Sequence, residues 1–136
     1  MAGRPIRITG EGTAVRSYLY ASDLAVWLWT ILFRGAPGRA YNVGSPAGVS
    51  IGELALEVGA VLGATQPVQL GAVARPSRRI ERYVPDVRRA ADELQLECRV
   101  PLGAAIRKTA EWSGWCDPAK GLSLRRRPYQ SGPSTL

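Results

Sequence analysis

The stretch "RITGEGTAVRSYLY", residues 7–20, decides the fold class of this chain. Gly10 and Gly12 have the spacing of the first two glycines of a G-x-G-x-x-G dinucleotide-binding loop, but the third position is Val15. A valine side chain there blocks the close helix–strand approach that the third glycine permits. The same fingerprint requires a helix to begin at the glycines, whereas "AVRSYLYA" is β-branched and aromatic and predicts a strand. We therefore expect a glycine-bearing hairpin loop between two strands, and no cofactor bound by this motif.

The composition is that of a single globular domain with a preference for anionic ligands. The chain has 136 residues and a net charge of +7, and 46% of its residues are apolar. Lys108 and Lys120 are the only lysines, which leaves 16 of the 18 basic residues as arginine. The planar guanidinium fork suits phosphate and carboxylate groups. There is no histidine, so the commonest general base is excluded from any catalytic role.

The cysteines and the apolar runs predict a cytoplasmic protein without a metal site. Cys98 and Cys116 do not have metal-ligand spacing, and free thiols in a reducing compartment are expected. The N-terminal stretch "MAGRPIRITG" has no apolar core of the kind a signal peptide carries. The most apolar run, "LAVWLWTILF" at 24–33, is about half as long as a membrane-spanning helix must be. We expect no contact with a membrane.

The apolar periodicity and the turn residues predict an α/β domain with short strands and about four helices. Ser22 is expected to cap the first helix, and Ser50 with Glu53 forms a capping box at the start of the second. Residues 1–116 are expected to fold, and 117–136 form a basic, Gly/Pro/Ser-rich tail that is expected to be disordered. The predicted strands are 5–9, 15–20, 39–45 and 67–70, the predicted helices are 23–33, 51–62, 86–96 and 101–113, and the segment 72–85 is predicted to be a basic loop.

The helix predicted at 23–33 is apolar on every side. One face contains Leu24, Trp27, Leu28 and Ile31, and the opposite side contains Val26, Trp29 and Phe33. A helix of this kind is buried or is covered by a partner. A chain of this length offers little to cover it, so we expect exposed apolar surface and a tendency to self-associate.

The order of these elements resembles the C-terminal part of an extended short-chain dehydrogenase/reductase. More narrowly, it resembles the NAD-dependent nucleotide-sugar epimerase/dehydratase family, nearest to its dTDP-glucose 4,6-dehydratase-like members. The family counterparts are a G-x-G-x-x-x-R-[DS]-[FWY] hairpin, a Y-V-x-D-[LV]-A helix start, a Y-N-[VI]-G strand and a late R-P-x-x-x-R-x-Y segment. The matching stretches are "PIRITGEGTAVRSYLYASDLA" (5–25), "AYNVGS" (40–45), "VSIGELA" (49–55), "RPSRRIERYVPD" (75–86), "RAADELQL" (89–96) and "PLGAAIRKTAEW" (101–112).

The resemblance also implies what this sequence lacks. Family members carry an N-terminal NAD-binding half with a glycine-rich loop, and a catalytic Tyr-x-x-x-Lys. No tyrosine here has a lysine four residues later. Residues 1–116 then correspond to the substrate-binding C-terminal region, with the Rossmann core missing and no catalytic residue in this chain. NAD would be bound by a separate half, and a nucleotide-diphosphate sugar would be the ligand. The resemblance also leaves assembly into a homo-oligomer open.

The resemblance implies roles for individual residues. Arg16 matches the arginine that contacts the diphosphate of the nucleotide-sugar, a role suited to a charge-assisted bidentate pair. Tyr18, two residues along the same strand, would lie beside the nucleotide; a half-buried structural tyrosine is the alternative. Asn42 in "YNVG" is a weaker substrate-side candidate, and its alternative role is to satisfy backbone groups at a strand end.

A second group of candidates lies in the arginine-rich segment. Arg75 matches a second diphosphate arginine, and Arg78 matches a position that meets the ribose. Family members have Gly-Asp or Gly-His after this Arg-Pro, so Ser77 and Arg78 depart from the pattern and put the ribose contact in doubt. The alternative is a solvated basic loop.

Two other functions stay open. One is a non-catalytic nucleotide-sugar binder or a remnant of the enzyme. The other is a basic nucleic-acid-binding module, which the charge alone would allow. The arginine cluster has no interleaved aromatic residue apart from Tyr83, and no nucleic-acid-binding motif was identified, so this last hypothesis is the weakest of the three.

Overall fold

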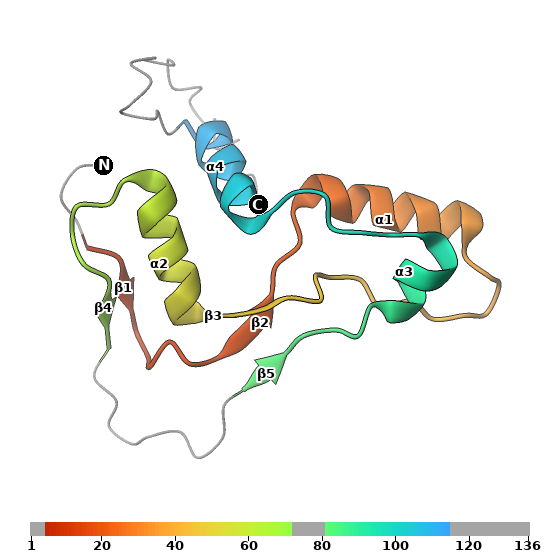
Figure 1. Ribbon diagram of the computed structural model, residues 1–136, viewed down its shortest axis with the longest axis horizontal. Coiled ribbons are helices and arrows are strands. Elements are labelled where there is room, and N and C mark those ends of the chain that lie inside the picture. Colours follow the sequence, from red (N-terminus) through yellow and green to blue (C-terminus); the bar gives the residue numbers. More distant parts are fainter. Residues whose placement is uncertain (1–4, 72–80, 115–136) are drawn as a thin grey trace, which may run out of the picture.

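Two small sheets form the β part of the molecule in the computed structural model, which describes residues 5–71 and 81–114 (Figure 1). In the first, β1 (Arg7–Ile8) pairs in parallel with β4 (Gln69–Leu70). In the second, β2 (Val15–Ser17) is central: it pairs antiparallel with β3 (Gly48–Ser50) and parallel with β5 (Arg82–Tyr83). Three of the four strands expected from the sequence, at 5–9, 15–20 and 67–70, are therefore present in shorter form. β3 was not predicted, and β5 lies in a segment that was expected to be loop.

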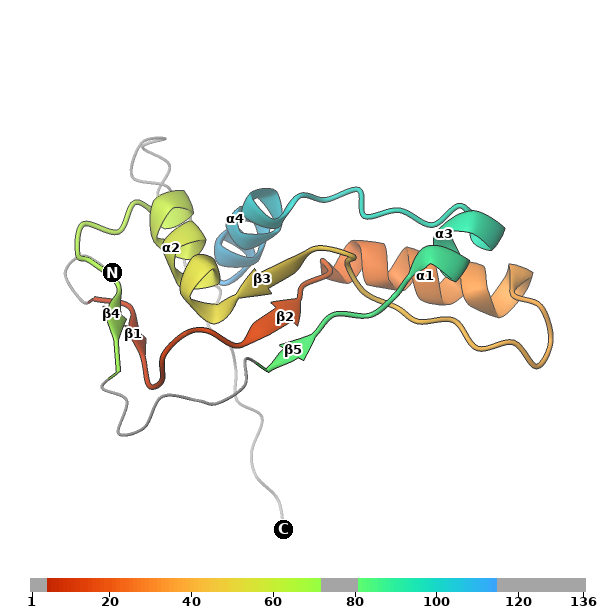
Figure 2. The same cartoon turned by 60° about the horizontal axis from the view of Figure 1, so that its bottom comes forward.

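The described residues form four helices, as the sequence predicted, and these helices pack in two pairs. α2 (Ile51–Leu62) contacts α4 (Leu102–Trp112), and α1 (Ala21–Arg34) contacts α3 (Arg88–Leu94). Both views show α2 and α4 beside the sheets and α1 with α3 at the other end of the molecule (Figures 1 and 2). The described residues therefore form an α/β fold.

The start of α2 follows directly from its local sequence. The Ser50 hydroxyl oxygen accepts a hydrogen bond from the Glu53 amide at 3.1 Å, and the Glu53 carboxylate accepts one from the Ser50 amide at 2.8 Å. These bonds hold the pKa of Glu53 below its usual value. The helix ends at Gly63, whose φ of 66° is the left-handed conformation that glycine adopts readily. The predicted capping box and helix end are both confirmed.

The buried core lies between α1 and the chain around α3. It contains Trp27, Val87, Ala90, Leu94 and Leu96. The indole N–H of Trp27 donates to the Glu97 carbonyl at 3.1 Å, so the largest buried ring also has its polar group satisfied. On α3, Ala90 and Leu94 are buried, whereas Ala91 is exposed.

The N-terminus of α1 differs from the prediction. The helix begins at Ala21 after Tyr20, and Ser22 does not act as its N-cap. The buried Asp23 carboxylate reaches across the core instead, and one of its oxygens accepts hydrogen bonds from the amides of Arg99 and Val100, each at 2.9 Å. A long-range contact therefore anchors this end of the helix, where the sequence suggested a local cap.

The Gly10–Gly12 loop is not a hairpin, because β1 and β2 belong to different sheets. Gly12 has a φ of 71°, and its carbonyl accepts a hydrogen bond from the Gly52 amide at 2.8 Å. A Cβ atom on Gly12 would lie 3.2 Å from the Gly52 backbone. The glycine thus permits close approach of this loop to the first turn of α2. The prediction that a strand follows this loop is confirmed.

One further prediction was wrong. Residues 39–45 do not join either described sheet; Tyr41 and Val43 pack against the core. The Arg89 side chain donates to the Ala40 carbonyl, and the Ser17 hydroxyl accepts from the Ser45 amide, so side chains satisfy part of the backbone there. The predicted tail 117–136 lies outside the described residues.

Candidate functional site

Arg16 is held at the centre of the three-stranded sheet. On β2 it stands opposite Val49 of β3 and Tyr83 of β5. Its guanidinium Nη1 donates to the carbonyls of Val15 at 3.0 Å and Glu81 at 3.3 Å, and Nη2 lies 2.7 Å from the Glu81 carboxylate. The side chain is 35% exposed. The guanidinium is thus fixed in direction by backbone oxygens while part of it remains open to solvent.

Glu81 is a member of this site that the sequence analysis did not single out. Its carboxylate is 75% exposed and occupies the position at which an anion would pair with Arg16. The proximity arises from the parallel pairing of β2 with β5, in which the Glu81 carbonyl also accepts from the Val15 amide at 2.8 Å. A carboxylate and a phosphate compete for the same donors of a guanidinium, so an anionic ligand would displace Glu81.

The structure gives less support to the other residues that were predicted to contact the ligand. Tyr18 follows directly after the last residue of β2 and is half-buried. Because the strand ends at Ser17, the alternation of side chains along a strand does not extend to Tyr18. Arg75 and Arg78 lie outside the described residues.

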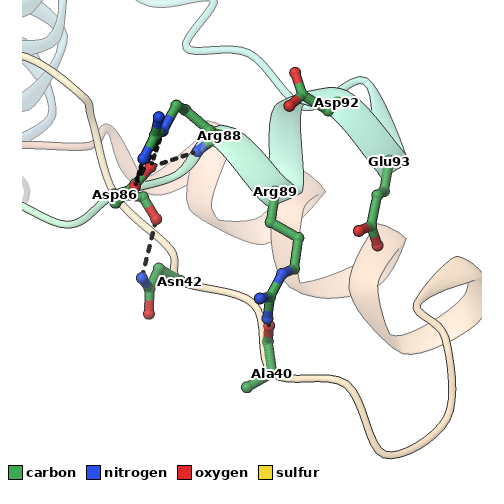
Figure 3. Close-up of a pocket in the computed structure, with 7 residues that line it drawn as sticks. All are labelled: Ala40, Asn42, Asp86, Arg88, Arg89, Asp92 and Glu93. Atoms are coloured by element: carbon green, nitrogen blue, oxygen red, sulfur yellow. Dashed lines mark hydrogen bonds and ion pairs between the residues drawn. The ribbon is translucent and has the colours of Figure 1, made fainter.

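Asn42 lies in a surface hollow formed by the segment 40–42 and α3, with a volume of about 480 Å³ (Figure 3). Its amide nitrogen donates to the Asp86 carbonyl at 2.9 Å. Asn42 therefore satisfies a backbone group, which is the alternative role that the sequence allowed. Arg16 and Tyr18 are not among the residues that line the hollow, which are Ala40, Asn42, Asp86, Arg88, Arg89, Asp92 and Glu93.

Most of the charged groups of this hollow already have hydrogen-bond partners. Arg88 donates two hydrogen bonds from Nε to Asp86 at 3.0 and 3.1 Å, and its hydrogen bonds lower the pKa of that carboxyl to about 2. Arg89 donates to the Ala40 carbonyl at 2.7 Å, as Figure 3 shows. Glu93 accepts from the Tyr41 hydroxyl at 2.8 Å. Three carboxylates line the hollow beside two engaged guanidinium groups, so it is poorly suited to a diphosphate.

Four sequence predictions about other groups concern the described residues. The Gly10–Gly12 loop leads into β2 and offers no helix N-terminus to a pyrophosphate, so it does not fit an NAD-binding loop. In the described ranges 5–71 and 81–114, no cluster of His, Cys, Asp or Glu could hold a metal ion. Within those same ranges, no helix is long and apolar enough to cross a bilayer. Cys98 is a free thiol.

Comparison with known proteins gives a matching family model and curated relatives that include dTDP-glucose 4,6-dehydratases. A family model described as the NAD dependent epimerase/dehydratase family matches residues 1–44. The dTDP-glucose 4,6-dehydratase of Xanthomonas campestris pv. campestris is 28% identical over 120 residues, which cover 82% of this chain and 34% of that protein. The dTDP-glucose 4,6-dehydratase 1 of Escherichia coli K12 is 27% identical over 130 residues, covering 88% of this chain and 36% of the relative.

Solved structures show the same relationship at the level of the fold. The UDP-glucose 4-epimerase of Thermotoga maritima, solved with UDP-glucose, has a TM-score of 0.67 and 22% identity over 79% of this chain and 34% of that chain. The Bordetella bronchiseptica enzyme WbmF, solved with NAD⁺, has a TM-score of 0.67 and 26% identity over 81% of this chain and 32% of that chain. The chain spans about a third of the length of these relatives.

Proposed function

Because this chain belongs to the NAD-dependent epimerase/dehydratase family, we propose that it contributes the nucleotide-sugar-binding part of such an enzyme. Arg16 contacts the diphosphate of the ligand, with Tyr18 beside the nucleotide. Arg75 and Arg78 are candidates for further contacts on the sequence pattern alone. The ligand is a thymidine or uridine diphosphate sugar, the two classes that the names of the relatives contain.

The geometry of Arg16 carries this proposal. Its guanidinium is oriented by the carbonyls of Val15 and Glu81. The side chain has therefore lost conformational entropy before a ligand binds, and this lowers the entropic cost of binding. Its side chain is partly exposed, and the competing group is a single exposed carboxylate. A diphosphate carries more negative charge than Glu81 and can accept a bidentate pair.

NAD is the cofactor of the proposed complete enzyme, where it would accept and return a hydride. WbmF and a dTDP-glucose 4,6-dehydratase from Bacillus anthracis were both solved with NAD, which supports this assignment. The spacing of Gly10 and Gly12 is suggestive, but their loop does not fit an NAD-binding loop. The proposal therefore places the NAD-binding residues outside these 136 residues. A non-catalytic nucleotide-sugar binder remains the alternative, and the cytoplasm is the proposed compartment.

A binding titration tests the proposal directly. The chain is titrated with dTDP-glucose and with UDP-glucose by calorimetry, and the titration is repeated with Arg16→Ala. We expect measurable binding of one ligand and a loss of at least about tenfold in affinity in the variant, because a charge-assisted hydrogen bond contributes about 1.5–3 kcal/mol. Arg7→Ala is the matched control: Arg7 is an exposed strand arginine that donates to Gln69, and its loss removes the same charge elsewhere.

The outcomes separate the candidate functions. Equal weak binding by the wild type and Arg16→Ala, or an equal loss in Arg7→Ala, would overturn the assignment of Arg16. A salt-sensitive complex with DNA of comparable affinity would instead favour the nucleic-acid-binding hypothesis, because such complexes weaken steeply with ionic strength.

A further inference from the structure

A single side chain holds the end of β2 against a segment that is distant in sequence. The Ser17 hydroxyl donates to the Ser45 carbonyl at 2.9 Å and accepts from the Ser45 amide at 2.8 Å. One hydroxyl thus pairs with both backbone polar groups of one residue, as a residue of a neighbouring strand does. Both bonds are partly buried and join positions 28 residues apart, so water competes with them only weakly.

The backbone next to Ser45 packs closely against this hydroxyl. Gly44 is buried, and a Cβ atom built on it would lie 3.1 Å from the Ser17 hydroxyl oxygen. The same atom would lie 2.5 Å from Pro85, which comes shortly after β5. The turn at 44–45 therefore fits tightly against the end of β2, and the hydroxyl has little room for another arrangement.

Ser17 itself does not face a ligand that binds at Arg16. The two residues are neighbours on β2, and successive side chains of a strand point to opposite faces of the sheet. The Ser17 hydroxyl is also engaged with both backbone groups of Ser45. Any role of Ser17 in ligand binding is therefore exerted through another residue.

Tyr18 is the residue whose placement depends most on this anchor. Arg16 pairs with Val49 on one side and with Tyr83 on the other, so its backbone is held without help from Ser17. In the described sheets the paired positions of β2 end at Ser17, and Tyr18 lies beyond them. Figure 2 shows the short connection that leads from β2 into α1. The Ser17 hydroxyl is thus the last contact that fixes the strand before Tyr18.

We propose that Ser17 is a positioning residue of the nucleotide-sugar site, whose hydroxyl fixes the backbone from which Tyr18 projects beside the nucleotide. This role rests on the proposed function, because it requires the ligand contacts given there for Arg16 and Tyr18. Loss of the hydroxyl leaves Arg16 in place and allows the connection to α1 to shift. The diphosphate then keeps its partner, while the nucleotide loses the ring beside it.

A double-mutant cycle in the whole 136-residue chain tests this role. UDP-glucose and dTDP-glucose are titrated by calorimetry into the wild type, Ser17→Ala, Tyr18→Ala and the double variant. We expect Ser17→Ala to weaken the affinity about five- to tenfold, because two hydrogen bonds are lost. In the Tyr18→Ala background the same change should cost less than about twofold, because no ring remains to be positioned.

Rescue and control variants separate positioning from general stability. Ser17→Thr keeps the hydroxyl in a residue suited to strands and should bind within about twofold of the wild type. Ser113→Ala is the matched control, because the Ser113 hydroxyl also donates to a backbone carbonyl, that of Thr109 at 2.9 Å, and its loss should leave the affinity unchanged. Urea unfolding shows whether each variant is folded. If Ser17→Ala is unfolded, Ser17→Cys takes its place, because a thiol of similar size hydrogen-bonds only weakly.

The possible failures can be told apart. A Ser17→Ala chain that binds as tightly as the wild type, or additive losses from Ser17→Ala and Tyr18→Ala, would overturn the role of Ser17 and leave the proposed function standing. A wild-type chain that binds neither sugar nucleotide would overturn the proposed function and the role of Ser17 with it.

Discussion

The Nη2 atom of Arg16 lies 2.7 Å from an oxygen of Glu81, across the parallel pairing of β2 with β5. The same carboxylate that orients the guanidinium would therefore have to leave when an anion binds. Because Glu81 is 75% exposed, its ion pair contributes little to stability, on the order of 0.2–1 kcal/mol. Displacing the Glu81 carboxylate from Arg16 therefore costs little free energy.

The first prediction concerns this competition. Glu81→Gln removes the negative charge that would oppose an incoming diphosphate, so we expect the affinity for a nucleotide-diphosphate sugar to rise about three- to tenfold. Calorimetric titration measures this, and thermal unfolding should show almost no change. Glu97→Gln is the control, because Glu97 forms a similarly exposed pair with Arg99. A gain of the same size in both variants would point to net charge rather than to competition at Arg16.

The second prediction compares the two glycines of the opening loop. Gly12→Ala should lower the free energy of unfolding by about 1–2 kcal/mol, because Gly12 has a φ of 71° and a Cβ atom there would crowd the Gly52 backbone. Gly10→Ala should have almost no effect, since no atom lies within 4 Å of a Cβ built on Gly10. Urea unfolding of both variants tests the contrast, and equal losses would show that the α2 contact does not matter.

These glycines also show which kind of contact could not be predicted from the sequence. The capping box at Ser50 and Glu53 was predictable because both residues act within one helical turn. The contact between Gly12 and Gly52 was not, because it joins a loop to a helix 40 positions further along the chain. The sequence pattern therefore suggested a hairpin where the chain instead crosses from one sheet to another.

The same difference between local and long-range contacts applies to the candidate site. Arg16 was singled out from its place in a motif, but its partner Glu81 is 65 residues away, and the parallel pairing of β2 with β5 brings them together. Asn42 was a weaker candidate, and the structure shows its amide bonded to the Asp86 backbone. Local patterns indicated which residues to examine, whereas the long-range strand pairing decided which side chains meet.

The third prediction concerns the buried carboxylate of α1. Asp23→Ala leaves the amides of Arg99 and Val100 without their acceptor, so we expect a loss of about 2–4 kcal/mol in the free energy of unfolding. Asp23→Asn should lose less, because both bonds go to one oxygen and the amide oxygen of asparagine can replace it. Urea unfolding measures both variants. If Asn were as damaging as Ala, the carboxylate charge and not the acceptor geometry would be the stabilising feature.

The last prediction concerns the pH dependence of Asp86. The hydrogen bonds from Arg88 lower the pKa of this carboxyl from 3.8 to about 2, with a smaller electrostatic contribution from Arg89. A pKa that is lower in the folded state stabilises the fold above the unfolded value, near pH 3.8, and this stabilisation is lost as the pH falls through about 2. A carboxyl-detected NMR titration should find the Asp86 midpoint near 2 in the wild type and higher in Arg88→Ala, but still below 3.8, because the backbone amide of residue 88 continues to donate to this carboxyl. Arg89→Ala should move it much less, because Arg89 bonds to the Ala40 carbonyl and not to this carboxylate. Equal shifts in the two variants would mean that general positive charge, and not the Arg88 hydrogen bonds, sets the pKa of Asp86.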